Sequence, residues 1–442
     1  MAQEVESLLA VILAGRRKSG RLDLEAVEMA TRAALHRAGA AVLEELLAAP
    51  DEYPRQVPCG CGRSAHYHES RPKQLLTVLG RVETERPYYV CPACHQGQSP
   101  RDQELDVEGT EYSPGVRRMM AVVGSETSFE QGREQLQLLA GLPVTTKAVE
   151  RHAEALGAEM AAQEQAAIQQ GLQLPLPPVG GPAIPVLYVE MDGTGVPVVS
   201  TETVGRAGKQ TEQARTREVK LGCVFTQTTV DARGRPRREE GSSTYTGGIE
   251  TAQAFGRRLC FEAYQRGWNR AQKKVVIGDG APWIWNLTAE HFPGAIQIVD
   301  LYHARQHLWE LSGKLWPSDE RHRRNWTRRR EKQLEGGRIE SLLRSLRALS
   351  SATPEAAELL RHTADYFAVN APRMRYPAFR RQHLFVGSGV VEAGCKTLIG
   401  SRLKRSGMFW RVRAANSIIA LRCHRLSGKF EDYWENRRVH AA

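Results

Sequence analysis

No stretch of about 18 consecutive apolar residues, the length that a membrane-spanning helix needs, occurs in this sequence of 442 residues. The N-terminus also lacks the charged, apolar and cleavage regions of a signal peptide. Internal repeats and low-complexity tracts are absent as well. These absences exclude integral membrane proteins and repeat proteins, and they favour a cytoplasmic protein with no membrane partner.

The eight cysteines do not suggest a disulfide framework. Four of them cluster as Cys59, Cys61, Cys91 and Cys94, whereas the others are scattered through apolar or helical sequence. In a reducing compartment this pattern favours a metal site over disulfides. Two ligand pairs on tight turns, with 29 residues between them, can close a tetrahedral Zn²⁺ site without a large core. The alternatives are a redox pair and a site in which a histidine replaces one cysteine, the candidates being His66, His68 and His95.

The basic excess of the chain is regional. The formal net charge is +11, and residues 301–442 hold 28 Lys and Arg against 13 Asp and Glu, which is +15 and leaves −4 for residues 1–300. A basic C-terminal third with interleaved Trp and Tyr suggests contact with a polyphosphate such as DNA. A solvated, arginine-rich helical surface is the alternative.

The N-terminal half predicts several small units. Residues 21–49 have helical spacing, and residues 55–100 contain short β-type runs with Gly80 as the expected hairpin turn. Helical sequence returns over residues 114–162, where Ser128 and Thr145 are expected to cap the two helices of a helix-turn-helix.

The second of these helices would present Lys147 and Arg151 near one face, together with His152. Arg and Lys can read guanine edges in a DNA groove or hold phosphates. A helical hairpin without DNA contact fits the same sequence.

The C-terminal half predicts an α/β core with an insertion. A stretch over residues 169–185 that is rich in Pro, Gly and Gln is typical of a linker. Beyond it, strand-like runs alternate with helical sequence and indicate a mixed sheet, the runs being residues 186–190, 219–227, 274–277 and 295–299. Residues 303–381 are almost wholly helix-forming, so we expect an all-helical insertion there.

Three acidic residues lie beside glycines and buried-type runs. Asp192 and Asp279 each follow an apolar run and precede a glycine, so each is expected where a strand ends, and Glu392 lies in a helical segment. Carboxylates held by a rigid sheet can bind two Mg²⁺ ions for phosphodiester displacement. Taken singly, each Asp-Gly pair also fits an ordinary turn.

Asp300 and His303 follow another strand-like run. The histidine could orient a carboxylate or touch a scissile phosphate. Alternatively, Asp300 simply caps the next helix and His303 lies in its first turn.

Basic and aromatic residues flank these acids. Arg328 and Arg329 belong to a cluster near Trp316 and Trp326 in the expected insertion. A second group follows Glu392 and comprises Arg402, Lys404, Arg405 and Trp410. The cations could hold a DNA strand and the aromatics could stack on a base, or the tryptophans could pack in a helical core.

These motifs resemble those of a known family. The segments Glu190-Met-Asp-Gly-Thr-Gly, Ile277-Gly-Asp-Gly-Ala, Asp300-Leu-Tyr-His and Gly387-Ser-Gly-Val-Val-Glu-Ala-Gly-Cys-Lys are similar to those of bacterial insertion-sequence DDE transposases of the ISKra type. The resemblance covers essentially the whole chain and is strongest over residues 186–300 and 384–425. The one-residue spacing of Cys59 and Cys61 departs from the two-residue spacing of many zinc ribbons.

The resemblance implies an RNase H-like core in which Asp192, Asp279 and Glu392 form the catalytic triad and hold two Mg²⁺ or Mn²⁺ ions. It implies an auxiliary role for Asp300 and His303. The expected function is to bind element ends and to catalyse DNA cleavage and strand transfer. The expected partners are double-stranded DNA, meaning terminal inverted repeats and target DNA, and further copies of the chain on DNA, in the bacterial nucleoid.

Two other functions remain open. One is an RNase H-like DNA endonuclease without strand transfer, and the other is a non-catalytic zinc-ribbon and helix-turn-helix DNA-binding protein.

The expected fold is therefore α+β and multidomain. It consists of an N-terminal helical segment (1–54), a zinc-ribbon-like module (55–105), a helix-turn-helix-like domain (110–165), a linker (166–185), a first RNase H-like part (186–302), the helical insertion (303–383) and a second core part with C-terminal helices (384–442).

Overall fold

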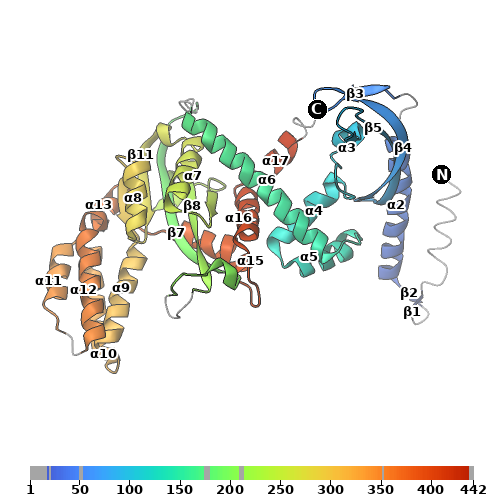
Figure 1. The fold of residues 1–442 in the computed structure, drawn as a ribbon. Coiled ribbons are helices and arrows are strands. Elements are labelled where there is room, and N and C mark those ends of the chain that lie inside the picture. Colours follow the sequence, from blue (N-terminus) through green and yellow to red (C-terminus); the bar gives the residue numbers. More distant parts are fainter. Residues whose placement is uncertain are drawn as a thin grey trace. The chain divides into compact units, whose positions relative to one another are not determined.

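The computed structural model describes residues 17–18, 21–48, 53–173, 180–208, 214–350 and 353–437. The chain divides into two compact units, one of residues 1–155 and 431–442 and the other of residues 156–430. Figure 1 shows the order of their elements along the chain. None of the helices in the described ranges has the length and apolar character that crossing a bilayer requires.

The first unit contains an antiparallel four-stranded sheet packed against a long helix. Helix α2 (Leu24–Leu47) begins at Asp23, whose side chain accepts from Ala26 N. The sheet order is β3-β4-β5-β6, and the strands are Gln56–Pro58, Ser64–Thr77, Gly80–Val90 and Gly97–Gln98. Gly80 closes the β4–β5 hairpin at a φ of 126°, as the sequence predicts, but the two strands are longer than the short runs we expected. A two-stranded ladder of β1 (Arg17–Lys18) and β2 (Arg21–Leu22) precedes α2.

The first unit also contains several helices, namely α3 (Pro100–Glu104), α4 (Pro114–Glu126), α5 (Phe129–Gln135) with a π-helical turn η1 (Leu136–Ala140), the start of α6 (Thr146–Gln173), and α17 (Phe430–Arg437). Two of them, α5 and α6, lie where the sequence predicts a helical pair. Ser128 Oγ accepts from Gln131 N at 3.3 Å, and Thr145 Oγ1 accepts from Ala148 N at 3.1 Å. Both predicted caps are therefore confirmed. Between them, Gly141 takes the left-handed conformation that ends the first helix.

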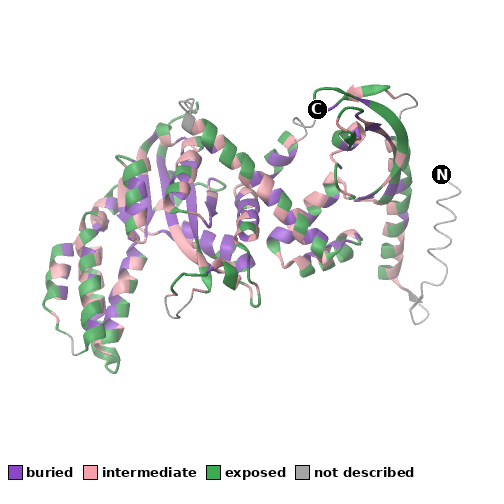
Figure 2. Cartoon of the chain, viewed as in Figure 1, coloured by how far each residue is buried: buried purple, intermediate pink, exposed green. Residues whose placement is uncertain are grey.

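The second unit is built on the mixed sheet that the sequence predicts. Its strand order is β10-β8-β7-β11-β12, and β9 pairs with β8. The strands are β7 (Ile184–Pro197), β8 (Thr216–Val230), β9 (Pro236–Arg238), β10 (Thr244–Gly248), β11 (Ala271–Gly278) and β12 (Ile296–Val299). β7, β8 and β10 are antiparallel, whereas β11 and β12 run parallel to β7. The central strands are buried on both faces (Figure 2).

Helices cover this sheet and extend away from it. The covering helices are α7 (Ala252–Gln265), the 3₁₀ turn η3 (Trp268–Arg270), α8 (Pro282–His291), α14 (Gly389–Gly394) with the π-helical η5 (Cys395–Gly400), α15 (Ser401–Leu403) and α16 (Val412–Leu426). A short 3₁₀ turn, η2 (Ser200–Glu202), follows β7. The all-helical segment contains α9 (Leu301–Leu315), α10 (Glu320–Glu335), α11 (Ile339–Arg347), α12 (Pro354–Val369), η4 (Ala371–Met374) and α13 (Tyr376–Arg381).

Two local predictions need correction. Helix α6 continues to Gln173, so the first part of residues 166–185 is helical, and residues 174–179 lie outside the described ranges. The sequence also did not predict β9 and β10, because β9 is only Pro-Arg-Arg and β10 is a short segment that ends in two glycines, so neither shows apolar alternation.

Candidate functional site

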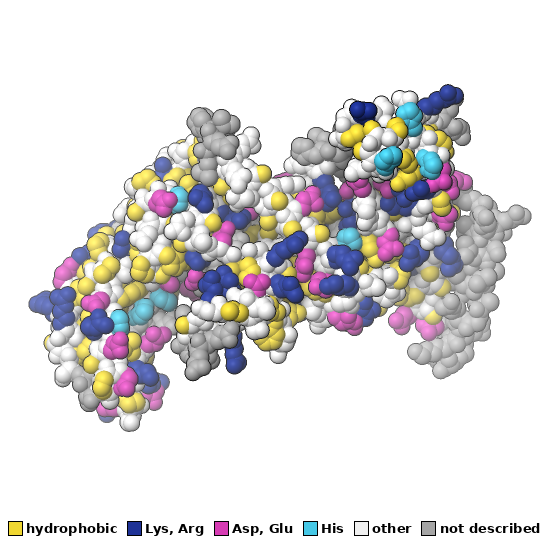
Figure 3. All heavy atoms as spheres, viewed as in Figure 1, with side chains coloured by type: hydrophobic (Ala, Val, Ile, Leu, Met, Phe, Trp, Pro, Cys, Tyr) yellow, Lys and Arg dark blue, Asp and Glu magenta, His cyan; other side chains and the backbone are white. Residues whose placement is uncertain are grey.

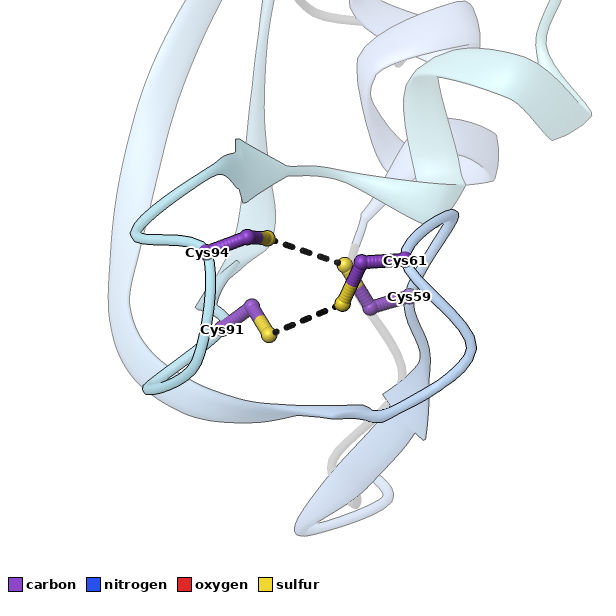
Figure 4. A group of neighbouring side chains, drawn as sticks. All are labelled: Cys59, Cys61, Cys91 and Cys94. Carbon is purple, nitrogen blue, oxygen red and sulfur yellow. Dashed lines mark hydrogen bonds between the residues drawn. The ribbon is translucent and has the colours of Figure 1, made fainter.

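Four cysteines from two turns of the first unit converge on one point (Figure 4). Their sulfur atoms all lie within 4.8 Å of one another, and the pairs Cys59–Cys94 and Cys61–Cys91 are each 3.6 Å apart. A zinc tetrathiolate with bonds of about 2.3 Å has sulfurs about 3.8 Å apart. This cluster therefore has the donor set and the spacing of a zinc site, and none of its cysteines forms a disulfide.

Tight turns aim these sulfurs inward. Cys59 N donates to Arg63 O at 2.7 Å in a turn that contains Gly62 at a φ of 83°. In the other turn, the backbone N–H groups of Cys94 and Ala93 point to the Cys91 sulfur and lower its pKa to about 6. A lowered thiol pKa favours the thiolate that a metal binds. The one-residue spacing between Cys59 and Cys61 therefore does not prevent convergence, and His66, His68 and His95 lie outside the cluster.

Asp192 and Asp279 meet at one edge of the sheet in the second unit. Strand β11 pairs with β7 up to Gly278, which lies opposite Met191. Asp279 follows directly, so the two aspartates occupy adjacent positions on neighbouring parallel strands, whose axes lie about 4.8 Å apart. This register results from the pairing of β7 with β11, two strands that are far apart in the sequence.

The prediction that Asp192 ends a strand is wrong. β7 continues to Pro197, because its antiparallel partner β8 extends the ladder past the glycines, with Asp192 opposite Leu221. Asp192 is half-buried, and the paired part of β11 stops beside it. Asp279 does end its strand, and its Oδ1 accepts from Ala281 N at 2.8 Å.

The two aspartates influence each other electrostatically. Burial raises the pKa of Asp192, and the charge of Asp279 raises it further, while the Gly193 N–H and the Cys395 thiol stabilise its carboxylate. Oδ1 of Asp192 accepts from Gly193 N at 2.7 Å. A bound divalent cation would relieve the repulsion between the two carboxylates.

Helix α14 brings Glu392 to the same region. This short helix packs against β7 and β8. A hydrogen bond from Val391 N to Glu190 Oε2, 2.8 Å long, fixes its first turn to β7. Glu392 is half-buried, and its Oε1 accepts from Ser388 Oγ at 3.4 Å. Its charge raises the pKa of both Glu190 and Cys395, although burial is the main cause of both shifts. The chain thus gathers three distant acids around one sheet edge.

The triad does not form a closed ion cage in this structure. Within the described ranges, only the four cysteines form a group of three or more His, Cys, Asp or Glu side chains whose ligand atoms lie close enough together to hold one ion. Asp192, Asp279 and Glu392 share a neighbourhood, and a common ion would require side-chain movement.

Glu190 is a buried carboxyl group beneath these acids. It lies two residues before Asp192 and so shares its face of β7. Glu190 is fully buried, and its Oε1 has no hydrogen-bond partner in the described part of the chain. Burial raises its pKa to about 8, with smaller contributions from Asp300 and Glu392. We therefore expect it to be protonated at neutral pH.

This protonation predicts a pH-dependent stability. The pKa of Glu190 in the folded protein lies above its ordinary value of 4.5. The contribution of Glu190 to the free energy of unfolding is therefore complete below pH 4.5 and is lost as the pH rises through about 8. The slope is at most about 1.4 kcal/mol per pH unit. We expect Glu190→Gln, which keeps an acceptor for Val391 N, to flatten this slope in urea unfolding without Mg²⁺.

Glu310→Gln on the exposed side of α9 is the matched control and should keep the wild-type slope. Parallel profiles for wild type and Glu190→Gln would contradict the assignment of the protonated state to Glu190.

Asp300 caps helix α9, which is the alternative role that the sequence suggests for it. The side chain is fully buried, and its Oδ1 accepts from His303 N at 2.7 Å. Its Oδ2 accepts from Ser388 N and from Ser388 Oγ, the latter at 2.6 Å. Asp300 thereby connects the start of α9 to the segment that carries Glu392, which is a positioning role.

Helix α9 also presents two histidines toward the aspartates. The charge of His303 lowers the pKa of Asp192, and the rings of His303 and His307 lie 5.1 Å apart. His307 packs at 4.1 Å against Tyr366, whose hydroxyl donates to Asp279 O at 2.8 Å. Burial and His303 lower the pKa of His307.

The helix-turn-helix exposes two of its three basic candidates. Lys147 and Arg151 are exposed on α6, and Lys147 pairs with Glu150 at 3.0 Å. His152 instead packs against Tyr112 at 5.0 Å, and burial lowers its pKa to about 4. His152 therefore faces inward rather than sharing the exposed face.

The basic segment after Glu392 is only partly at the surface. Arg402 is fully buried with its guanidinium 5.0 Å from the Trp410 ring, so its prediction as a DNA contact is wrong. Trp410 is 6% exposed, and its indole N–H donates to Leu403 O, which favours packing over base stacking. Lys404 is exposed and donates to Thr194 Oγ1, two residues from Asp192, and Arg405 is half-buried.

The predicted cations of the insertion lie at its surface. Arg328 and Arg329 are exposed on α10. Trp326 is buried and its ring lies 5.2 Å from that of Trp316, so both tryptophans pack together. Figure 3 shows Lys and Arg side chains interleaved with Asp and Glu side chains over this part of the chain.

Sequence reasoning missed several neighbours of the acids. Glu190 had a usable signal, since a charged residue in a buried strand two positions from Asp192 must share its face. His307 lies four residues from His303, on the same face of a helix. Ser388 and Cys395 carried no signal, because their roles depend on how α14 docks.

Comparisons with known proteins add little. No protein-family model matches the chain, and no curated protein matches it. Among solved structures, the chain is similar to one described as "Drosophila P element transposase strand transfer complex", with 11% identity over 73% of this chain and 80% of that chain. The TM-score is 0.24, a likeness too low to support a conclusion about fold or function.

Proposed function

We propose that this chain is a DDE transposase of a bacterial insertion sequence, of the ISKra type, with an RNase H-like core. The supporting observation is the register of β7 and β11, which places Asp192 beside Asp279, together with the helix that brings Glu392 to the same edge. Two carboxylates on a rigid sheet and a third on a helix that packs against it are suited to phosphodiester chemistry. The mixed sheet and the all-helical segment agree with the expected core and insertion.

The donor set suits hard divalent cations, because carboxylate oxygens are the ligands that Mg²⁺ prefers. Asp192 and Asp279 would hold both ions and Glu392 one, and the repulsion between the two aspartates favours a cation there. When bound, Mg²⁺ or Mn²⁺ supplies the positive charge that in-line displacement at a phosphodiester needs. His303 would contact the scissile phosphate, while Asp300 and Ser388 position Glu392.

Other parts of the chain would bind DNA. Lys147 and Arg151 of α6 would contact the terminal inverted repeats. Lys404 would hold a phosphate near the acids, because its ammonium group lies beside Thr194. The cysteine cluster would bind structural Zn²⁺ and stabilise its module, and target DNA and further copies of the chain would complete the nucleoid-associated assembly.

A cell-free assay tests this proposal. The purified chain is incubated with Mg²⁺, a supercoiled plasmid and duplexes that carry the candidate element ends, either intact or pre-cut with a free 3′ hydroxyl. We expect cleavage at the ends and joining of pre-cut ends to the plasmid. Duplexes with scrambled ends are the matched control and should remain unjoined.

The same assay separates the two rival functions. Cleavage without joining of pre-cut ends would identify an endonuclease. Binding of the ends without cleavage or joining would identify a non-catalytic DNA-binding protein.

A further inference from the structure

A hollow opens on the first turns of helix α10, at one end of the insertion. Its volume is about 310 Å³, which is enough for a phosphate and part of its sugar. Besides Asp319, which caps the helix, the lining residues are Arg321, His322, Asn325, Trp326, Arg329 and Arg330. Most of these side chains are cations or hydrogen-bond donors, so the hollow is suited to an anion.

The acidic groups of α10 are already engaged elsewhere. The helix carries seven Lys and Arg against three Glu. Glu320 pairs with Arg324 at 2.8 Å, while Glu331 and Glu335 bond to Arg305 and Trp309 of α9. Arg321 and Arg329 are exposed and have no carboxylate partner among the described residues. Their charge is therefore available to a ligand.

The Asp319 carboxylate is also engaged, because its Oδ1 accepts from His322 N at 2.8 Å. Asp319 is the one acid among the lining residues, against three arginines, and among the described residues it forms no ion pair with any of them, so the lining keeps an excess of positive charge.

Trp326 and Arg330 supply an independent indication of a ligand. Trp326 is 7% exposed, and its indole N–H has no hydrogen-bond partner within the described ranges. A buried donor without an acceptor costs about 1–3 kcal/mol. Its ring is covered by Trp316 and by the Arg330 guanidinium at 5.3 Å, so it is not free to stack on a base.

Arg330 is anchored rather than free, since its Nη1 donates to Gln333 at 2.9 Å and to Ser345 at 3.0 Å. Burial lowers its pKa, and the neighbouring Arg329 lowers it further. A bound anion would reduce this repulsion and would offer an acceptor to the Trp326 indole.

We propose that this hollow binds a backbone phosphate of DNA, held by Arg321 and Arg329 with His322 and Asn325 as further donors. The inference rests on the proposed function, because it takes DNA as the polyanion. The occupant is recognised by its charge and oxygen acceptors, and its base is not read.

The position of the hollow indicates which phosphate it would hold. Helix α9 begins at Asp300 beside the acids and leads to the end of the insertion where α10 starts (Figure 1). At 1.5 Å per residue, the 15 residues of α9 span about 22 Å. This corresponds to about six base pairs of duplex at 3.4 Å each. The hollow would therefore bind DNA that flanks the cleavage site rather than the scissile phosphate.

The experiment measures DNA affinity as a function of salt. Asp192→Asn protein, which should bind without cutting, is compared with the same protein carrying Arg329→Gln, or Arg324→Gln as the matched control. Arg324 lies on the same helix but outside the hollow and is paired with Glu320. We expect Arg329→Gln to weaken binding about tenfold at low salt and to reduce the slope of log K against log salt by about 0.9, whereas Arg324→Gln changes neither. Equal slopes for the two variants would overturn the proposal.

A second readout does not depend on catalysis. The indole ¹⁵N–¹H signal of Trp326, assigned with Trp326→Phe, should shift when duplex DNA is added and should shift less in the Arg329→Gln protein. No shift, or an equal shift with inorganic phosphate at the same phosphate concentration, would overturn a DNA-backbone site. Wild-type protein that shows the duplex shift but never cleaves DNA would overturn the proposed function and leave this site standing.

Discussion

Replacing Asp192 with Asn is expected to reduce the rate of DNA strand cleavage by at least about a thousandfold, because each 1.4 kcal/mol of lost transition-state stabilisation costs about a factor of ten. Asn has the same shape as Asp and can still accept from Gly193 N. It removes the charge that a divalent cation would need. DNA affinity should stay within about twofold, because sequence-independent affinity comes mainly from Lys and Arg contacts to phosphates.

Cleavage rates are measured under single-turnover conditions with Mg²⁺, and binding is measured separately by fluorescence anisotropy. Asp365→Asn is a matched control, since this exposed aspartate of α12 pairs with Arg361 and lies outside the acidic cluster. Glu392→Gln should behave as Asp192→Asn does. A wild-type cleavage rate in either of these variants would refute the triad.

Replacing Cys91 with Ser should unfold the four-stranded module and release its zinc. Structural zinc contributes roughly 10–16 kcal/mol of apparent binding free energy, which matches or exceeds the net stability of a typical domain, roughly 5–15 kcal/mol. Cys91 is fully buried among the other three sulfurs, so Ser cannot restore a thiolate ligand there. We expect zinc to fall from about one equivalent to less than about half an equivalent.

Zinc content is measured by mass spectrometry of the purified protein, and unfolding of the module by limited proteolysis of the β4–β5 hairpin. Cys260→Ser is the matched control, because Cys260 lies in the other unit and outside the cluster. Less than half an equivalent of zinc in the wild type, unchanged by Cys91→Ser, would remove the zinc assignment.

Much of the local structure follows from the sequence. Asp23, Ser128 and Thr145 precede helices and cap them, and Gly80 closes a hairpin. These features depend on a few neighbouring residues, so local chemistry is enough to predict them. The mixed sheet was also predictable, because alternating strand and helix patterns extend over long segments.

Burial within the site was less predictable. Arg402, Lys404 and Arg405 look equivalent as a basic run, yet Arg402 is fully buried and Lys404 is exposed. Composition reports charge, whereas burial depends on which side of a docked helix a residue occupies. Trp410 illustrates the same point, because only packing shows that its ring is covered by Arg402.

The sequence by itself determined which functional groups the two candidate sites contain, namely four thiols in two pairs and carboxylates beside buried strands. The tertiary structure decided which of these groups meet. Strand alternation assigns Glu190 and Asp192 to one face, but the pairing of β11 up to Gly278 brings Asp279 beside Asp192, and the docking of α14 places Glu392 nearby. Pairing between strands and packing between helices join residues far apart in the chain, and local sequence patterns do not encode their register.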